Sequence, residues 1–147
     1  MTEAAPTPIV DSPFDWVKKQ IDEYIKTDGE RPVFRYGAPL VLITTKGRKS
    51  GTWHRTCLIG TSDGDDVIVV ASTGGAPQHP VWYLNLEANQ RVWVQQGARS
   101  FWTTAHTATP DEKPRLWEKM VGLYPDYANY QERTDREIPV VILTPDE

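Results

Sequence analysis

Residues 40–71 read LVLITTKGRKSGTWHRTCLIGTSDGDDVIVVA. Within this stretch, Leu40–Thr45, Trp53–Thr61 and Val67–Ala71 are rich in β-branched and apolar residues, which predicts three consecutive strands. The segment Ser62–Asp66 between the last two runs contains only turn-forming residues, so it predicts a hairpin. Strands joined by short turns rather than by helices indicate an antiparallel sheet or small barrel, not a parallel βαβ sheet.

The rest of the chain extends this pattern to six strands, all expected to be antiparallel. Two helices interrupt the strands, and Thr109 with Glu112 gives a capping-box signal for the second of them. The fold class is therefore α+β. The further strands are expected at Arg91–Gln96, Arg99–Ala108 and Ile138–Thr144, and the helices at Pro80–Asn89 and from Pro110 towards Tyr124.

The N-terminal part of the chain divides into two segments. Residues 1–12 have neither a basic start nor an apolar run, so we expect a disordered tail rather than a secretory signal. In Pro13–Thr27 the apolar residues recur at helical spacing, which predicts an amphipathic helix. Its apolar stripe is expected to dock on the core; the alternatives are a lid over a pocket or peripheral contact with a membrane. Residues 13–147 then form one domain.

Composition excludes several classes of function. The net charge of −4 argues against a basic face that binds nucleic acid. The single cysteine, Cys57, excludes an internal disulfide and fits a reducing, cytoplasmic compartment. The three histidines lack the spacing that brings two metal ligands onto one helix face, so no metal site is expected.

A G-x-S-x-G string at Gly60–Gly64 resembles the turn that holds a catalytic serine in hydrolases. It falls on the predicted hairpin, where Gly, Ser and Asp are ordinary turn residues, so we do not assign a nucleophile. The chain has no evident catalytic apparatus of its own, and any chemistry is expected to come from a bound organic cofactor.

Residues 31–55 contain six cations and no Asp or Glu, although the protein is acidic overall. The cations are Arg31, Arg35, Lys46, Arg48, Lys49 and Arg55. At their centre, Thr44–Gly51 forms a strand-connecting loop with two glycines and several donors, which favours an anion site. The loop is not a Walker motif, and a merely solvated hairpin loop is the alternative.

Two other features suit a ligand with a phosphate and a large heterocycle. Val70–Gly75 leaves a strand with paired glycines, which can expose backbone amides to such a ligand. Trp82 and Tyr83 open the next helix. Tyr124, Tyr127 and Tyr130 share one face if that segment is helical, and they either pack in the core or wall a flat ring system.

The motifs that combine these features resemble the deazaflavin-dependent nitroreductase and quinone reductase family of actinobacteria. The likeness covers nearly everything after Leu40. It rests on Thr44-Thr45-x-Gly47-Arg48-Lys49-Ser50-Gly51, on Ala71-Ser72-x-Gly74-Gly75-Ala76-x-x-x-Pro80-x-Trp82-Tyr83-Leu84-Asn85-Leu86, and on Tyr124-Pro125-x-Tyr127-x-x-Tyr130 with Thr134-Asp135-Arg136-x-Ile138-Pro139.

This resemblance implies a split β-barrel with flanking helices, similar to flavin reductases, that binds the deazaflavin coenzyme F-420. The cationic loop would receive the coenzyme phosphate and acidic tail. The implied coenzyme contacts are Lys46, Arg48, Lys49, Ser50, His54, Arg55, Thr56, Cys57, Leu58, Ile59, Val70, Ala71, Ser72, Thr73, Trp82, Tyr83, Leu84, Asn85 and Tyr127. Those facing the substrate would be Tyr124, Tyr127, Tyr130 and Ile59, and those orienting it or donating a proton would be Tyr127, Tyr130 and Ser72.

The resemblance also implies hydride transfer to a planar electron-poor acceptor such as a quinone, a conjugated carbonyl compound or a nitro compound. Family members often carry Lys where Thr73 stands and Tyr where Ile59 stands, so two polar groups are missing here. The alternatives are a flavin mononucleotide (FMN) oxidoreductase on the same barrel and a non-catalytic coenzyme carrier. The expected partner is a small molecule, and the expected assembly is a monomer or weak homodimer.

Overall fold

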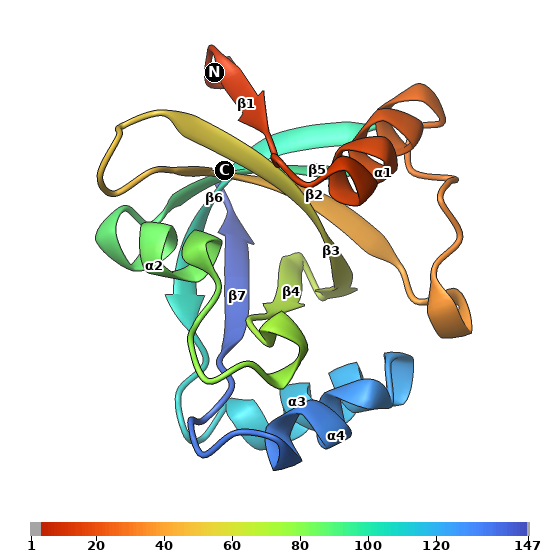
Figure 1. Ribbon diagram of the computed structural model, residues 1–147, viewed down its shortest axis with the longest axis vertical. Coiled ribbons are helices and arrows are strands. Elements are labelled where there is room, and N and C mark those ends of the chain that lie inside the picture. Colours follow the sequence, from red (N-terminus) through yellow and green to blue (C-terminus); the bar gives the residue numbers. More distant parts are fainter. Residues whose placement is uncertain (1–3, 147) are drawn as a thin grey trace.

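The computed structural model describes residues 4–146 (Figure 1). Four α-helices, two short 3-10 turns and seven strands make up this part of the chain. In order they are β1 (Ile9–Asp11), α1 (Asp15–Lys26), η1 (Arg35–Gly37), β2 (Leu40–Lys46), β3 (Trp53–Asp63), β4 (Asp66–Val70), η2 (Thr73–Gly75), α2 (Val81–Ala88), β5 (Arg91–Gln96), β6 (Arg99–Thr107), α3 (Lys113–Leu123), α4 (Asp126–Glu132) and β7 (Val140–Pro145).

Six of the strands form a closed antiparallel barrel. Their order is β3, β2, β5, β6, β7 and β4, and β4 pairs back onto β3. The predicted α+β barrel of about six strands is thus confirmed. The capping box is confirmed as well, because Thr109 N donates to Glu112 Oε1 at 2.9 Å and Glu112 N to Thr109 Oγ1 at 3.3 Å.

Strand β3 changes partner at Gly60, and this change closes the barrel. Ile59 is paired with Leu40 of β2, whereas Gly60 is paired with Val69 of β4. A Cβ atom on Gly60 would come within 2.5 Å of the Val41 side chain. Glycine is therefore needed for close packing at this point of the strand. This explains one glycine of the G-x-S-x-G string, which lies in the β3–β4 hairpin as predicted.

The expectation of a disordered tail over residues 1–12 is wrong for its described part, whereas the six expected strands all pair antiparallel as predicted. Ile9–Asp11 form β1, which pairs in parallel with Trp53–Arg55. The first residues of β3 have β2 on one side only, since β4 pairs with the strand beyond Ile59, so an edge is left for β1 to fill. Residues 1–3 lie outside the described part of the chain.

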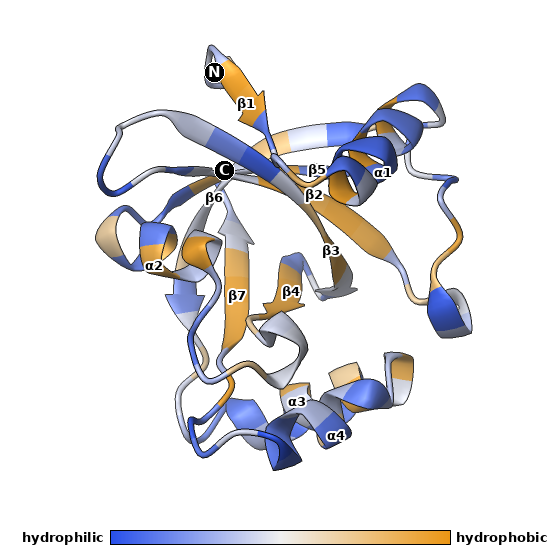
Figure 2. Cartoon of the chain, in the orientation of Figure 1, coloured by the Kyte–Doolittle hydropathy of each residue, from blue (hydrophilic) through white to orange (hydrophobic). Residues whose placement is uncertain are grey.

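Buried apolar side chains form three clusters, and Figure 2 shows how hydrophobic strands β4 and β7 are. Inside the barrel, Val41 and Ile43 pack with Tyr83 and Leu86 of α2. On one outer face α1 covers Leu42, and on another α3 and α4 cover the outer residues of β4 and β7. Because β4 and β7 are buried on both faces, their sequences are continuous apolar runs.

Helix α1 docks on the barrel as its apolar stripe predicted. Val17, Ile21 and Tyr24 are buried, whereas Phe14 and Trp16 remain exposed. None of the helices formed by residues 4–146 has the length and apolar character that crossing a bilayer requires.

Replacing Tyr24 by Phe tests how α1 is attached. The Tyr24 hydroxyl donates to Leu40 O at 3.0 Å and accepts from Gly97 N at 2.7 Å, so its loss leaves a part-buried amide without a partner. We expect the free energy of unfolding to fall by about 1–3 kcal/mol, measured by urea denaturation. A change below about 0.5 kcal/mol would show that these bonds do not hold the helix.

Candidate functional site

The cationic loop, residues 46–51, is closed by its own hydrogen bonds. Gly47 N donates to Thr52 O at 2.7 Å, and Gly51 N donates to Gly47 O at 2.8 Å. Ser50 Oγ accepts from Thr52 N at 3.1 Å and lies 3.4 Å from His54 Nε2. Gly47 has no room for a side chain, since a Cβ atom would come 2.5 Å from Ser50 Oγ.

Asn85 attaches this loop to helix α2. Its side chain is buried, Oδ1 accepts from Arg48 N at 3.1 Å, and Nδ2 donates to Thr45 Oγ1 at 3.4 Å. The resemblance implied a coenzyme contact for Asn85. The structure places it behind the loop, where it holds the loop backbone.

Three of the six cations predicted to form one strip gather in this loop. Lys46, Arg48 and Lys49 are exposed, line a hollow of about 700 Å³ together with Glu87, and form no ion pair within residues 4–146. The remaining cations do not line the hollow, and two of them have carboxylate partners. Arg35 pairs with Asp126 at 3.5 Å and Arg55 with Asp11 at 2.6 Å. Positive charge without a partner is thus gathered around the hollow, where it can bind an anion.

The predicted coenzyme strand, His54–Ile59, directs its side chains to two faces. His54, Thr56 and Leu58 lie opposite Thr45, Ile43 and Val41, which belong to the barrel's inner face. Cys57 instead packs against the α1 cluster, where burial raises the pKa of its thiol to about 12. The expectation that the whole strand lines one groove is therefore wrong for the side chains of Arg55 and Cys57, because successive strand residues point to opposite faces.

Arg136 organises the loop that follows β4, and sequence reasoning assigned it no role. Its guanidinium donates to Ser72 O at 2.7 Å, Ala76 O at 2.9 Å and Ala71 O at 3.2 Å, and it lies 3.0 Å from His79 Nδ1. Arg136 appeared in a motif, but the sequence could not show that it reaches carbonyls more than 60 positions away.

The same loop rests on helix α4. A Cβ atom on Gly75 would come 2.6 Å from Tyr130 O, so only glycine allows this approach. Ser72 is half-buried and Thr73 is exposed with a positive φ of 46°. The structure thus places the loop that carries Ser72 against the helix that carries Tyr130.

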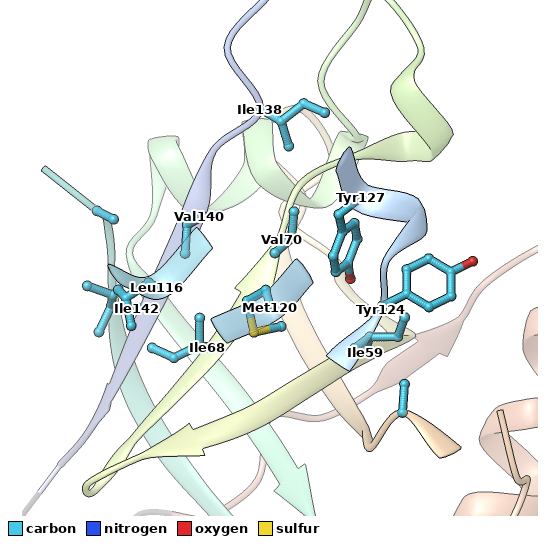
Figure 3. Packing of buried hydrophobic residues seen from close by; sticks show 12 residues of the cluster. Ile59, Ile68, Val70, Leu116, Met120, Tyr124, Tyr127, Ile138, Val140 and Ile142 are labelled. Carbon is cyan, nitrogen blue, oxygen red and sulfur yellow. The ribbon is translucent and has the colours of Figure 1, made fainter. Parts of the chain in front are cut away.

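Tyr124, Tyr127 and Tyr130 form one cluster, although they do not lie on one face of a single helix as expected. Tyr124 ends α3 and the other two lie on α4. The ring centroids of Tyr124 and Tyr127 are 5.0 Å apart, and the hydroxyls of Tyr124 and Tyr130 are 3.1 Å apart. Ile59 lies against the cluster, and the Tyr124 hydroxyl points away from the packed aliphatic side chains (Figure 3).

The surroundings of two tyrosines in this cluster favour the protonated phenol. Burial raises the pKa of Tyr124 and of Tyr127 well above the ordinary value for tyrosine. Tyr127 is 4% exposed, and its hydroxyl has no hydrogen-bond partner within the described residues. Tyr130 is half-buried, so among the three it has the side chain that is most accessible to a ligand.

Residues 70–88 connect the two halves of the site. Their first part contacts α4 through η2, and their last part, α2, fixes the cationic loop through Asn85. Tyr83, an implied coenzyme contact, is 4% exposed inside the barrel, and its hydroxyl lies 2.7 Å from Thr107 Oγ1. The structure thus makes Tyr83 part of the core, while Trp82 and Leu84 are half-buried.

The variant Arg136→Lys tests the organising role of Arg136. Lysine cannot donate simultaneously to three carbonyls in fork geometry, so we expect a loss of about 1–3 kcal/mol of stability. Amide hydrogen exchange in residues 72–79 should become faster, while exchange in α1 stays unchanged. Arg133→Lys is the matched control, since Arg133 is exposed and contacts only Gly74 O of this loop, at 3.5 Å. Equal effects of the two variants would contradict the assignment.

Comparison with solved structures finds close relatives of this fold. A structure described as a domain-swapped dimer has a TM-score of 0.69 and 40% identity, covering 90% of this chain and 99% of that one. The F420-H2 dependent reductase FDR-A has a TM-score of 0.67 and 42% identity, covering 71% and 93% of the two chains. A pyridoxamine 5'-phosphate oxidase of Listeria innocua shares the fold alone, at 13% identity and a TM-score of 0.52.

Sequence comparison identifies the family. The F420H(2)-dependent quinone reductase Rv1261c of Mycobacterium tuberculosis is 41% identical over 109 residues, which span 72% of this chain and 73% of that protein. The model of the family described as F420H(2)-dependent quinone reductase matches residues 16–145. The chain therefore belongs to the F420H(2)-dependent quinone reductase family, an oxidoreductase family.

Proposed function

We propose that this protein transfers a hydride from reduced coenzyme F-420 to a quinone or another planar electron-poor acceptor. Family membership makes it a deazaflavin-dependent reductase. The observation that carries the proposal within the molecule is the group of three cations, Lys46, Arg48 and Lys49, that surround the hollow without ion pairs in the described chain. Conjugated carbonyl and nitro compounds are further acceptors that we propose.

The site fits the coenzyme that the family uses. A phosphate and an acidic tail need donors and positive charge, and the cationic loop offers exposed cations on a backbone held by Asn85. Glu87 lies at the same hollow and adds one negative charge to it, so three cations face one carboxylate. The balance remains positive in a protein whose net charge is −4.

In this proposal the protein's own residues bind the coenzyme and orient and polarise the acceptor. The coenzyme, when bound, supplies the hydride. We propose that Lys46, Arg48, Lys49 and Ser50 hold its anionic part, and that His54, Thr56 and Leu58 with the 70–76 loop shape the groove beside it. Tyr127 and Tyr130, with Ser72, would orient the acceptor. A protonated phenol donates a hydrogen bond to a carbonyl or nitro oxygen as negative charge develops there.

Absence of a nucleophile among these groups is consistent with such a mechanism. Positioning a ring against an acceptor and excluding water require aromatic walls and fixed donors, which the tyrosine cluster supplies. Ile59 leaves the floor of this cluster apolar, so we expect the protein to favour acceptors with fewer polar substituents at that position.

Two expectations about partners stay predictions. Phe14 and Trp16 are 63% and 65% exposed at the start of α1, and peripheral membrane contact would take place there. A weak homodimer is supported by the relative that forms a domain-swapped dimer.

Removing charge from the cationic loop tests the binding site. We expect Arg48→Ala combined with Lys49→Ala to weaken coenzyme binding by ~2–4 kcal/mol, since charge-assisted contacts are lost from an exposed loop. Fluorescence titration of the coenzyme at several salt concentrations measures this, and the salt dependence should also fall. Lys18→Ala with Lys19→Ala on α1 removes the same charge elsewhere and should change little. Identical titration curves for the unmodified protein and both double variants would show that the loop does not bind the coenzyme.

Turnover tests the reaction itself. Purified protein mixed with reduced coenzyme F-420 should reduce menadione faster than the coenzyme alone does. The return of the absorbance of the oxidised coenzyme measures the rate. Tighter binding of FMN than of coenzyme F-420 would favour a flavin enzyme on this barrel. Tight coenzyme binding without turnover on quinones, enones and nitroaromatics would instead indicate a carrier.

A further inference from the structure

The segment Phe34–Gly37 packs across the tyrosine cluster, although it lies about 90 positions away in sequence. Arg35 Nη1 pairs with Asp126 Oδ2 at 3.5 Å, and the Tyr36 hydroxyl donates to Asp126 Oδ1 at 3.1 Å. The Tyr36 ring stands edge-on to Tyr124, with centroids 5.6 Å apart, and Phe34 lies 5.8 Å from the same ring. This segment therefore extends the aromatic cluster outward.

Tyr36 has features that core packing does not explain. It is 64% exposed, so most of its ring faces solvent although two contacts hold the ring in place. Its backbone adopts φ 60° and ψ 12°, a left-handed conformation that glycine adopts much more readily. A large side chain kept in such a conformation and exposed at the edge of a site indicates a functional role rather than a structural one.

We propose that Tyr36 is a specificity-determining residue of the acceptor site, with its ring, held beside Tyr124 by Asp126, forming the outer wall against which a planar acceptor stacks. This rests on the proposed function, which places the acceptor at the tyrosine cluster. The hydroxyls of Tyr124 and Tyr130 lie 3.1 Å apart and the Tyr36 ring contacts Tyr124, so hydrogen-bonding groups and a flat aromatic surface meet at one place. A conjugated ring with carbonyl oxygens matches both.

Asp126 holds this segment in place, because one of its carboxylate oxygens accepts from Tyr36 and the other from Arg35. Asp126 also helps to raise the pKa of Tyr124. The Tyr36 hydroxyl donates a hydrogen bond to this carboxylate, so the face of the ring rather than the phenol is offered to a ligand.

Tyr36→Gly is the decisive variant, because glycine removes the ring and suits the positive φ. Quenching of tryptophan fluorescence measures the binding of menadione to the coenzyme-free protein. Steady-state kinetics with reduced coenzyme F-420 are measured in parallel. We expect menadione affinity to fall about 3- to 10-fold. KM should rise by the same factor with kcat within about twofold. Coenzyme affinity and the thermal midpoint should not change.

Tyr36→Asn is the second variant, since Asn also tolerates a left-handed backbone and should lose affinity in the same way. Phe14→Ala is the matched control, because Phe14 is an aromatic residue that is 63% exposed at the start of α1. It should leave menadione binding and kinetics unchanged.

The outcomes separate the two proposals. Equal menadione binding by the unmodified protein and both Tyr36 variants, with turnover intact, would overturn the role of Tyr36 and leave the reaction standing. Weaker binding by both variants, without turnover in any of the proteins, would support Tyr36 and count against the reaction. A lower thermal midpoint in both variants, with a loss of coenzyme binding, would show that Tyr36 is structural and overturn the inference.

Discussion

Strand β3 pairs with β2 along its first half and with β4 along its second, and the rest of the structure depends on this double pairing. It closes the barrel, so both faces of β4 and β7 become buried and need helices outside. It also directs the β2–β3 loop to one end of the strand and Ile59 to the floor of the tyrosine cluster. Gly60, which lacks the Cβ atom that would strike Val41, makes the change of partner sterically feasible.

Two polar side chains hold the loops of the candidate site in place on the barrel. Asn85 holds the backbone of the cationic loop from behind, and Arg136 gathers three carbonyls of the loop after β4. Both use buried or part-buried hydrogen bonds, which weigh more than exposed ones because the alternative is an unpaired polar group. The candidate site is therefore positioned by residues whose side chains face the protein, while the cations of the loop are exposed.

The cations of residues 31–55 differ in their surroundings: some pair with carboxylates and others line the hollow. Arg35 and Arg55 stabilise packing of the η1 segment and of β1 through carboxylate partners. Lys46, Arg48 and Lys49 line a hollow and have no such partner among the described residues. The tyrosines also differ in their surroundings: Tyr24 and Tyr83 are buried in the core, whereas Tyr36 is exposed.

The sequence by itself determined the six barrel strands, the first three helices, the antiparallel barrel class, the cationic loop and the family motifs, because hydrophobic period, turn residues and local charge are properties of neighbouring residues. Only the tertiary structure decided that Ile9–Asp11 add a parallel strand, that Arg55 and Cys57 face away from the groove, that Arg136 reaches Ser72, and that Tyr36 joins Tyr124. These contacts join positions that lie between 44 and about 90 residues apart. No local pattern encodes such pairings, since they arise when barrel closure brings distant segments together.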